Sequence, residues 1–223
     1  TALRRENTMP LEVVGLGVSC VDYTGVVENI PGVDETTLMV DFSKQMGGPV
    51  AVALVTFANL GGVAGYIGKI GKDVEGEIIK KTFHQFGVDI KYLIEEENTQ
   101  TSLSFILVEK KSGKRTIIFN PECSFSLSFS EFDHGSITGA KFLYLDGGAP
   151  EAAIDAANWA KNKGVKIVLD AGVNMQHMVD LVRKSDIVIA SKSFVLNFAN
   201  GSNMEKGMRE IAKFGPNIVV ATC

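Results

Sequence analysis

The sequence has no excess of positive charge and no long apolar run. Its 223 residues carry a formal net charge of −4, so the composition gives no reason to expect a nucleic-acid partner. No apolar stretch approaches the length of a membrane span, and residues 1–12 lack the apolar centre of a signal peptide. We therefore expect a protein with neither a nucleic-acid nor a membrane partner.

Cysteine and histidine are scarce and scattered. Cys20, Cys123 and Cys223 are odd in number and far apart, which fits reduced thiols in the cytoplasm and gives no paired zinc spacing. The three histidines are isolated from one another as well, so they favour ordinary surface or core positions over a metal site. These scarcities predict a cytoplasmic location and no metal held by the protein alone.

What the sequence does contain is enough apolar material for one substantial core. The hydrophobic fraction is 45% and the charged fraction 22%, as in soluble globular proteins. From Lys141 onward apolar strands alternate with helices, which predicts a parallel sheet with helices on both faces. Strands are expected at 141–146, 165–170, 186–190 and 217–223, and helices at 150–163, 175–183 and 204–214.

The stretch 45–76 predicts a glycine turn, a helix, a turn, a strand, a turn and a second helix. Gly47 and Gly48 stand directly before an apolar run, whose Pro49 suits the first turn of a helix. A second glycine pair ends this run, and Asp73 can cap the helix that follows the strand. Glycines before a helix let a ligand approach its backbone donors, although an ordinary glycine turn is the simpler interpretation.

Two further segments are rich in β-branched and alternating residues. They are 36–43 and 101–120, and the second contains a turn at 112–114 that predicts a hairpin. Together these strands can form a small accessory sheet inserted into the alternating chain.

Three aspartates follow or close apolar strands. Asp22 comes just past the buried strand expected at 11–19, and Asp146 and Asp170 close two later strands. In an open α/β sheet the carboxyl ends of the strands border the ligand crevice, where an acceptor-only group suits sugar hydroxyls. Each aspartate is also a plausible helix or turn cap.

The stretch 45–76 resembles the first signature of the ribokinase-like (phosphofructokinase-B-type) carbohydrate kinases. In that family a Gly-Gly pair starts a helix at the sugar site, and the pattern continues through a Leu-Gly turn, a glycine-containing strand and an Asp before Gly-Glu. The resemblance implies a three-layer α/β sandwich over residues 1–223, with a mostly parallel central sheet. It also implies a small β-sheet lid, with strands within 23–46 and 101–120, that pairs two subunits into a homodimer.

The resemblance further implies ATP-dependent phosphorylation of a sugar hydroxyl with Mg²⁺. The residues that it marks on the sugar side are Asp22, Gly47, Gly48, Val52, Thr101, Arg115 and Asp146, and those on the nucleotide side are Asp170, Lys192 and Thr222. For Arg115 a solvated turn charge is the competing interpretation.

The sequence departs from the family pattern at two places. Many members have Asn where this chain has Val52, so the identity of the sugar stays open. Where the family has Asn-x-x-Glu, which organises magnesium through water, this chain has Ser191-Lys192-Ser193-Phe194 and no carboxylate. Lys192 can instead meet a phosphate as a point charge.

The family's second signature, a Gly-Ala-Gly-Asp run that carries the catalytic base, is not found before the last residue, Cys223. We therefore expect the base beyond Cys223, an incomplete domain, and no catalysis by these 223 residues alone. Two alternatives stay open. One is a nucleoside kinase, with Phe42, Phe105 and Phe119 as candidates to meet a base, and the other is a sugar-binding or oligomerising module without catalysis.

Overall fold

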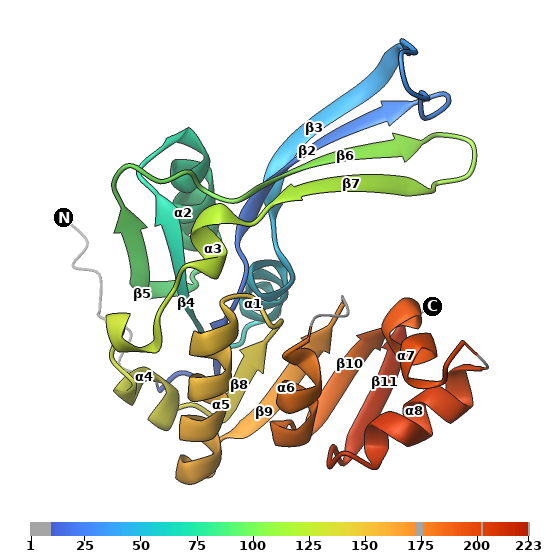
Figure 1. The fold of residues 1–223 in the computed structure, drawn as a ribbon. Coiled ribbons are helices and arrows are strands. Elements are labelled where there is room, and N and C mark those ends of the chain that lie inside the picture. Colours follow the sequence, from blue (N-terminus) through green and yellow to red (C-terminus); the bar gives the residue numbers. More distant parts are fainter. Residues whose placement is uncertain (1–9, 173–175, 202, 223) are drawn as a thin grey trace, which may run out of the picture.

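The computed structural model describes residues 10–172, 176–201 and 203–222. Its body is a seven-stranded sheet in which all neighbouring strands are parallel, in the order β11-β10-β9-β8-β1-β4-β5 (Figure 1). The strands are β1 (Val13–Leu16), β4 (Ala64–Gly71), β5 (Asp89–Glu96), β8 (Phe142–Leu145), β9 (Lys166–Ala171), β10 (Ile187–Ser191) and β11 (Ile218–Thr222). Parallel order brings their carboxyl ends to one edge of the sheet.

Helices cover both faces of this sheet, which confirms the three-layer α/β prediction. α1 (Pro49–Asn59) and α2 (Val74–Phe86) pack on one face, and α5 (Pro150–Lys163) and α6 (Met178–Lys184) on the other (Figure 1). The remaining helical segments are α3 (Glu122–Phe125), η1 (Phe129–Glu131), α4 (Gly135–Thr138), α7 (Lys192–Phe198) and α8 (Met204–Ala212). Among the described residues, none of these helices is long and apolar enough to cross a membrane.

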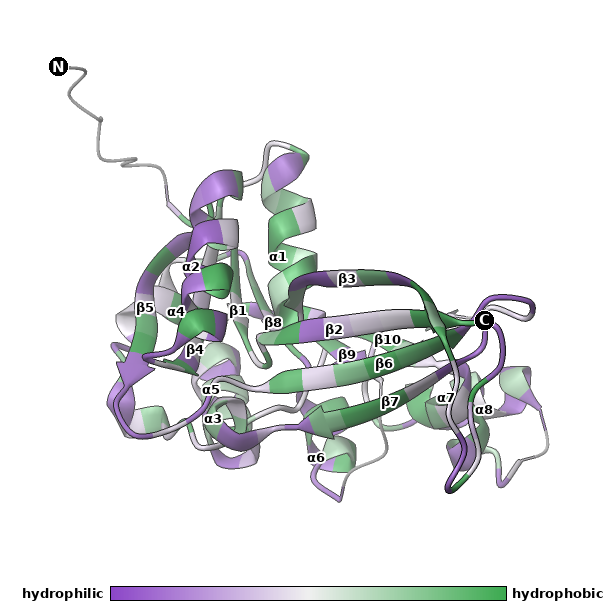
Figure 2. Ribbon diagram, turned by 90° about the horizontal axis from the view of Figure 1, so that it is seen from above, coloured by the Kyte–Doolittle hydropathy of each residue, from purple (hydrophilic) through white to green (hydrophobic). Residues whose placement is uncertain are grey.

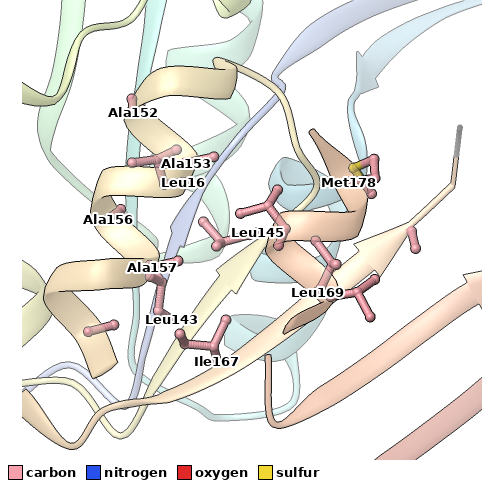
Figure 3. Close-up of a cluster of buried hydrophobic side chains, with 14 of the residues drawn as sticks. Leu16, Leu143, Leu145, Ala152, Ala153, Ala156, Ala157, Ile167, Leu169 and Met178 are labelled. Atoms are coloured by element: carbon pink, nitrogen blue, oxygen red, sulfur yellow. The ribbon is translucent and has the colours of Figure 1, made fainter. Parts of the chain in front are cut away.

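Figure 3 shows why α5 packs closely on the sheet. Its buried face is made of alanines three or four residues apart, which bring the helix backbone near the strands. They meet branched side chains of β1, β8 and β9, each worth about 1.5–3 kcal/mol on full burial. The residues in this contact are Ala152, Ala153, Ala156, Ala157, Leu16, Leu143, Leu145, Ile167 and Leu169.

The expected ends of the first two helices are confirmed. The Asp73 carboxylate accepts a 2.8 Å hydrogen bond from the Gly76 amide at the start of α2. At the end of α1, the amides of Gly61 and Gly62 donate to Ala58 and Phe57 carbonyls, and Gly61 has a φ of 96°.

A second, four-stranded sheet projects from the body and corresponds to the small sheet expected as a lid; it is called the lid below (Figure 1). Its strands are β2 (Cys20–Val27), β3 (Met39–Gly47), β6 (Leu103–Glu109) and β7 (Arg115–Asn120), in the order β3-β2-β6-β7. β2 and β6 are parallel, whereas the other two pairs are antiparallel. The hairpin expected within 101–120 is confirmed as β6 and β7.

Two details of the lid correct the sequence analysis. The first buried strand ends at Leu16, so Asp22 lies inside lid strand β2 rather than just past a strand of the central sheet. The strand expected at 36–43 lies instead at 39–47, because it pairs with the whole of β2 up to Cys20↔Gly47.

Candidate functional site

A cavity of about 500 Å³ lies between the lid and the edge of the central sheet. Its walls come from the segments at the ends of β1, β8 and β9, from the start of α1, and from one face of β2, β6 and β7. The lining residues are Val18, Cys20, Asp22, Gly48, Pro49, Ser104, Ile106, Ile117, Phe119, Pro121, Phe125, Asp146, Gly148, Asp170 and Gly172. Of the residues expected from the sequence, Asp22, Gly48, Asp146 and Asp170 thus share one cavity.

Asp22 enters the cavity from the lid and lies against Gly47. A Cβ atom built on Gly47 would stand 2.3 Å from Asp22 Oδ2, so only glycine leaves room for this carboxylate. The Cys20 thiol donates to Asp22 Oδ1 at 3.4 Å, and burial followed by the Asp22 charge raises the pKa of Cys20 to about 12. Cys20 therefore stays a neutral thiol beside Asp22.

Gly48 is required by the protein's own packing. Its φ is 98°, and an added Cβ would lie 2.3 Å from the Val18 carbonyl oxygen. A larger residue at Gly48 would therefore strain the backbone itself as well as block a ligand. Gly47 is the last residue of β3, whereas Gly48 is the N-cap of α1, and of the two only Gly48 has a positive φ.

Asp146 is buried between the end of β1 and the start of α1. Its carboxylate accepts backbone hydrogen bonds from Val18 (2.9 Å), Gly148 (2.8 Å) and Val50 (3.4 Å). Burial raises the pKa of Asp146 from 3.8 to about 6, against the lowering effect of these three amides. The carboxylate therefore joins three segments of the chain and neutralises the amide-rich start of α1.

Asp170 lies near the end of β9 and lines the same cavity. The Tyr144 hydroxyl donates to Asp170 Oδ2 at 3.2 Å, and partial burial raises the pKa of the Asp170 carboxyl. The prediction that Asp146 and Asp170 face one crevice from neighbouring strand ends agrees with this geometry.

Of the residues expected on the sugar side, four do not line the cavity: Gly47, Val52, Thr101 and Arg115. The Thr101 hydroxyl is buried, donates to Asp73 Oδ1 at 2.7 Å and accepts from the Gly71 amide at 2.9 Å, so it joins α2 to β4. Val52 lies one turn into α1 with 45% of its surface exposed. Their placement supports a structural role for Thr101 and gives Val52 no contact with the cavity.

A second, open cleft of about 520 Å³ gathers the expected cations. It is lined by Arg115, Ser191, Lys192, Ser193, Leu196 and Thr222. The Ser191 hydroxyl donates to the carbonyl of Gly172, which lines the first cavity, so the two spaces adjoin. Arg115, expected on the sugar side, therefore lies with the two nucleotide-side candidates Lys192 and Thr222.

The sequence analysis missed the apolar wall that the lid gives to the cavity. Alternation along β6 and β7 directs Ile106, Ile117 and Phe119 inward. Of the three phenylalanines considered for a nucleobase, only Phe119 lines the cavity. Phe42 and Phe105 stack about Tyr23, at centroid distances of 6.4 and 5.4 Å. The hairpin was predictable, but which of its faces turns inward was not.

Metal ligands do not converge in the part of the chain that the structure describes. No three histidine, cysteine, aspartate or glutamate side chains there are grouped as they would be around an ion. The second cleft offers two cations and several hydroxyls, which suit phosphate oxygens.

The sequence is similar to those of known sugar kinases. The chain is 30% identical over 167 residues to the 5-dehydro-2-deoxygluconokinase of Shouchella clausii, a match that covers 71% of this chain and 50% of that protein. The chain thus spans half the length of this relative.

Solved structures share the fold. A putative ribokinase from Agrobacterium tumefaciens matches with a TM-score of 0.84 at 18% identity, covering 96% of this chain and 71% of that one. Ribokinase of Arabidopsis thaliana, solved with ribose and ATP, matches with a TM-score of 0.78 at 19% identity, covering 96% of this chain and 72% of that one. Residues 11–222 match the family described as pfkB family carbohydrate kinase, and the chain belongs to that family.

Proposed function

We propose that the protein transfers a phosphoryl group from ATP to a hydroxyl of a sugar held under the lid. The observation that carries this proposal is the cavity itself, in which Asp22 projects from the lid beside the start of α1. An ionised carboxylate accepts hydrogen bonds from two sugar hydroxyls at once, and Asp22 is free of backbone amides in the described structure, unlike Asp146. Asp22 is therefore the main sugar-holding residue, while Asp146 fixes the shape of the cavity floor.

The adjoining cleft is the proposed place of the ATP phosphates. Lys192 and Arg115 supply positive charge, and Thr222 supplies a hydroxyl at the end of β11. Because Gly172 and Ser191 link the two spaces, the terminal phosphate would meet the sugar near Asp170. The cleft has no carboxylate among its described residues, so Mg²⁺ would be held chiefly by the phosphates of ATP. We assign the proton-accepting role to none of the described residues.

The lid restricts access of water to this reaction. Its inner face is largely apolar at Ile106, Ile117 and Phe119, and water is the competing acceptor in phosphoryl transfer. Such a wall also packs against the carbon skeleton of the substrate, leaving Asp22 to orient the hydroxyls.

The outer face of the lid is the proposed homodimer surface. Met39, Phe42, Phe105 and Ile118 expose 54, 54, 52 and 67% of their surfaces there, and Figure 2 shows the apolar character of β6 and β7. A second copy of the chain would cover them. We expect Phe105→Lys to shift the protein from dimer to monomer in sedimentation velocity, and an unchanged sedimentation coefficient would remove this surface from the dimer.

Free buried thiols at Cys20 and Cys123 accord with a cytoplasmic protein.

The direct test measures the release of ADP by the complete protein that the gene encodes. ATP is supplied with ribose, fructose, adenosine or 5-dehydro-2-deoxygluconate, and we expect turnover only with an acceptor present. Arg115→Ala should raise the KM for ATP and leave the KM for the acceptor within twofold, because Arg115 lies in the phosphate cleft. Turnover that does not depend on any acceptor, or that Arg115→Ala alters only through the acceptor, would contradict the proposal.

A further inference from the structure

One acidic side chain of helix α2 contacts two neighbouring strands of the lid. Glu75 lies in the first turn of α2, and its Oε1 atom accepts hydrogen bonds from the Tyr23 hydroxyl at 2.5 Å and the Lys44 ammonium at 3.0 Å. Tyr23 and Lys44 are cross-strand partners in β2 and β3, and the ammonium lies 4.7 Å from the centre of the Tyr23 ring. These three side chains, which we call the lid anchor, therefore join α2 to both strands at once.

The start of α2 is itself held in place. Its N-cap, Asp73, accepts hydrogen bonds from the amides of Gly76 and Thr101, at 2.8 Å each. The side chains of Glu75 and Lys44 are 21% and 28% exposed, so solvent screens their ion pair only in part. The hydrogen bond from Tyr23, followed by that from Lys44, lowers the pKa of Glu75 and keeps this acceptor ionised.

The lid anchor lies one residue from the carboxylate that we assign to the sugar. Asp22 precedes Tyr23 in β2, and because side chains alternate along a strand, Asp22 faces the cavity while Tyr23 faces α2. Their partners in β3, Gln45 and Lys44, are likewise adjacent. The place of the Asp22 carboxylate therefore follows the place of β2. A displacement of β2 by about 1 Å is enough to break hydrogen bonds between Asp22 and a sugar.

We infer that Glu75 is a positioning residue for sugar binding, which sets the place of β2 through Tyr23 and Lys44 and thereby the place of Asp22 in the cavity. Glu75 is not among the described residues that line the cavity, so it acts on the sugar through the lid and not by contact. The inference rests on the proposed function, because it needs Asp22 to hold the sugar.

The test removes the acceptor of the lid anchor and, separately, a matched carboxylate. Glu75→Ala leaves both lid residues without their partner, whereas Glu75→Gln keeps an acceptor for the Tyr23 hydroxyl. Glu77→Ala is the control, because Glu77 lies in the same turn and its ion-pair partner Lys80 belongs to α2. Calorimetry on the complete wild-type protein with ribose, fructose, adenosine and 5-dehydro-2-deoxygluconate identifies the compound bound most tightly, and the variants are measured with that compound.

We expect Glu75→Ala to raise the Kd and the KM of this compound by fivefold or more and to leave the KM for ATP within twofold. Glu75→Gln should lose less affinity than Glu75→Ala, and Glu77→Ala should stay within twofold of the wild type. The double variant of Asp22→Ala and Glu75→Ala should bind no more weakly than Asp22→Ala alone, because Glu75 acts through Asp22. Thermal unfolding shows that each variant is folded at the assay temperature, and a loss of stability alone then leaves the Kd unchanged.

Three results overturn the inference while the kinase function stands. The first is a Kd within twofold of the wild type in Glu75→Ala, and the second is an equal rise in Glu77→Ala, which would come from any loss of charge in this turn. The third is an additive loss in the double variant, which would mean that Glu75 does not act through Asp22. If the wild-type protein binds none of the four compounds, both the inference and the proposed function fail.

Discussion

Gly47→Ala tests the role of Asp22 without replacing that residue. The backbone of Gly47 lies outside the positive-φ region, so alanine is compatible with its conformation. The obstacle is the Asp22 carboxylate, whose Oδ2 would lie 2.3 Å from the new Cβ, whereas ordinary contact begins near 3.4 Å. The carboxylate must retreat by about 1 Å, enough to break the hydrogen bonds that we propose it makes to a sugar. Such bonds are worth about 1.5–3 kcal/mol, roughly a 10- to 150-fold rise in Kd for the sugar.

The assay is a double-mutant cycle read by calorimetry with the sugar that the wild-type protein binds most tightly. Gly47→Ala and Asp22→Ala should weaken binding to a similar extent, and the double variant should be no worse than Asp22→Ala alone, because the clash disappears with the carboxylate. Thermal unfolding of the four proteins checks that folding is retained. Wild-type affinity in Asp22→Ala would show that Asp22 does not hold the sugar. Wild-type affinity in Gly47→Ala, or strictly additive losses in the double variant, would show that Gly47→Ala does not act through Asp22.

Three further predictions concern stability. Gly48→Ala should lower the free energy of unfolding in urea by more than Gly47→Ala does. At Gly48 the new Cβ would clash with the Val18 carbonyl oxygen, and the residue would also have to adopt a positive φ. Equal losses in the two variants would contradict that strain. Thr101→Val should cost about 1–3 kcal/mol in the same measurement and leave the Kd of the sugar unchanged, whereas weaker binding would return Thr101 to the sugar site. Burial raises the pKa of Asp146 from 3.8 to about 6, so folding favours the protonated carboxyl. The stability that this group contributes is fully present below pH 3.8 and is lost as the pH rises through about 6. At about 1.36 kcal/mol per pKa unit, the free energy of unfolding changes by an amount on the order of 3 kcal/mol. Asp146→Asn cannot ionise, so its free energy of unfolding should change less between pH 5 and 8 than that of the wild type, and parallel curves would refute the assignment.

Local chemistry determined much of this protein from the sequence alone. The alternation after Lys141 predicted the strands and helices of the sheet's second half, because each element shows its own period of apolar residues. The start of α1 at Pro49 and the Asp73 cap of α2 were predictable because they depend on neighbouring residues only. Strand β5 and helix α7 were not predicted, since β5 carries a mixed polar pattern and α7 is a seven-residue helix.

The tertiary structure alone decided which of the candidate residues meet. Asp22 comes to Gly47 because β2 pairs with β3, and Arg115 comes to Lys192 because the lid hairpin extends over the end of the sheet. Thr101 was drawn away from the cavity by its bonds to Asp73, a residue 28 positions earlier in the chain. These are long-range pairings, and a sequence read one segment at a time fixes the period of a strand but neither its partner nor the face that turns inward.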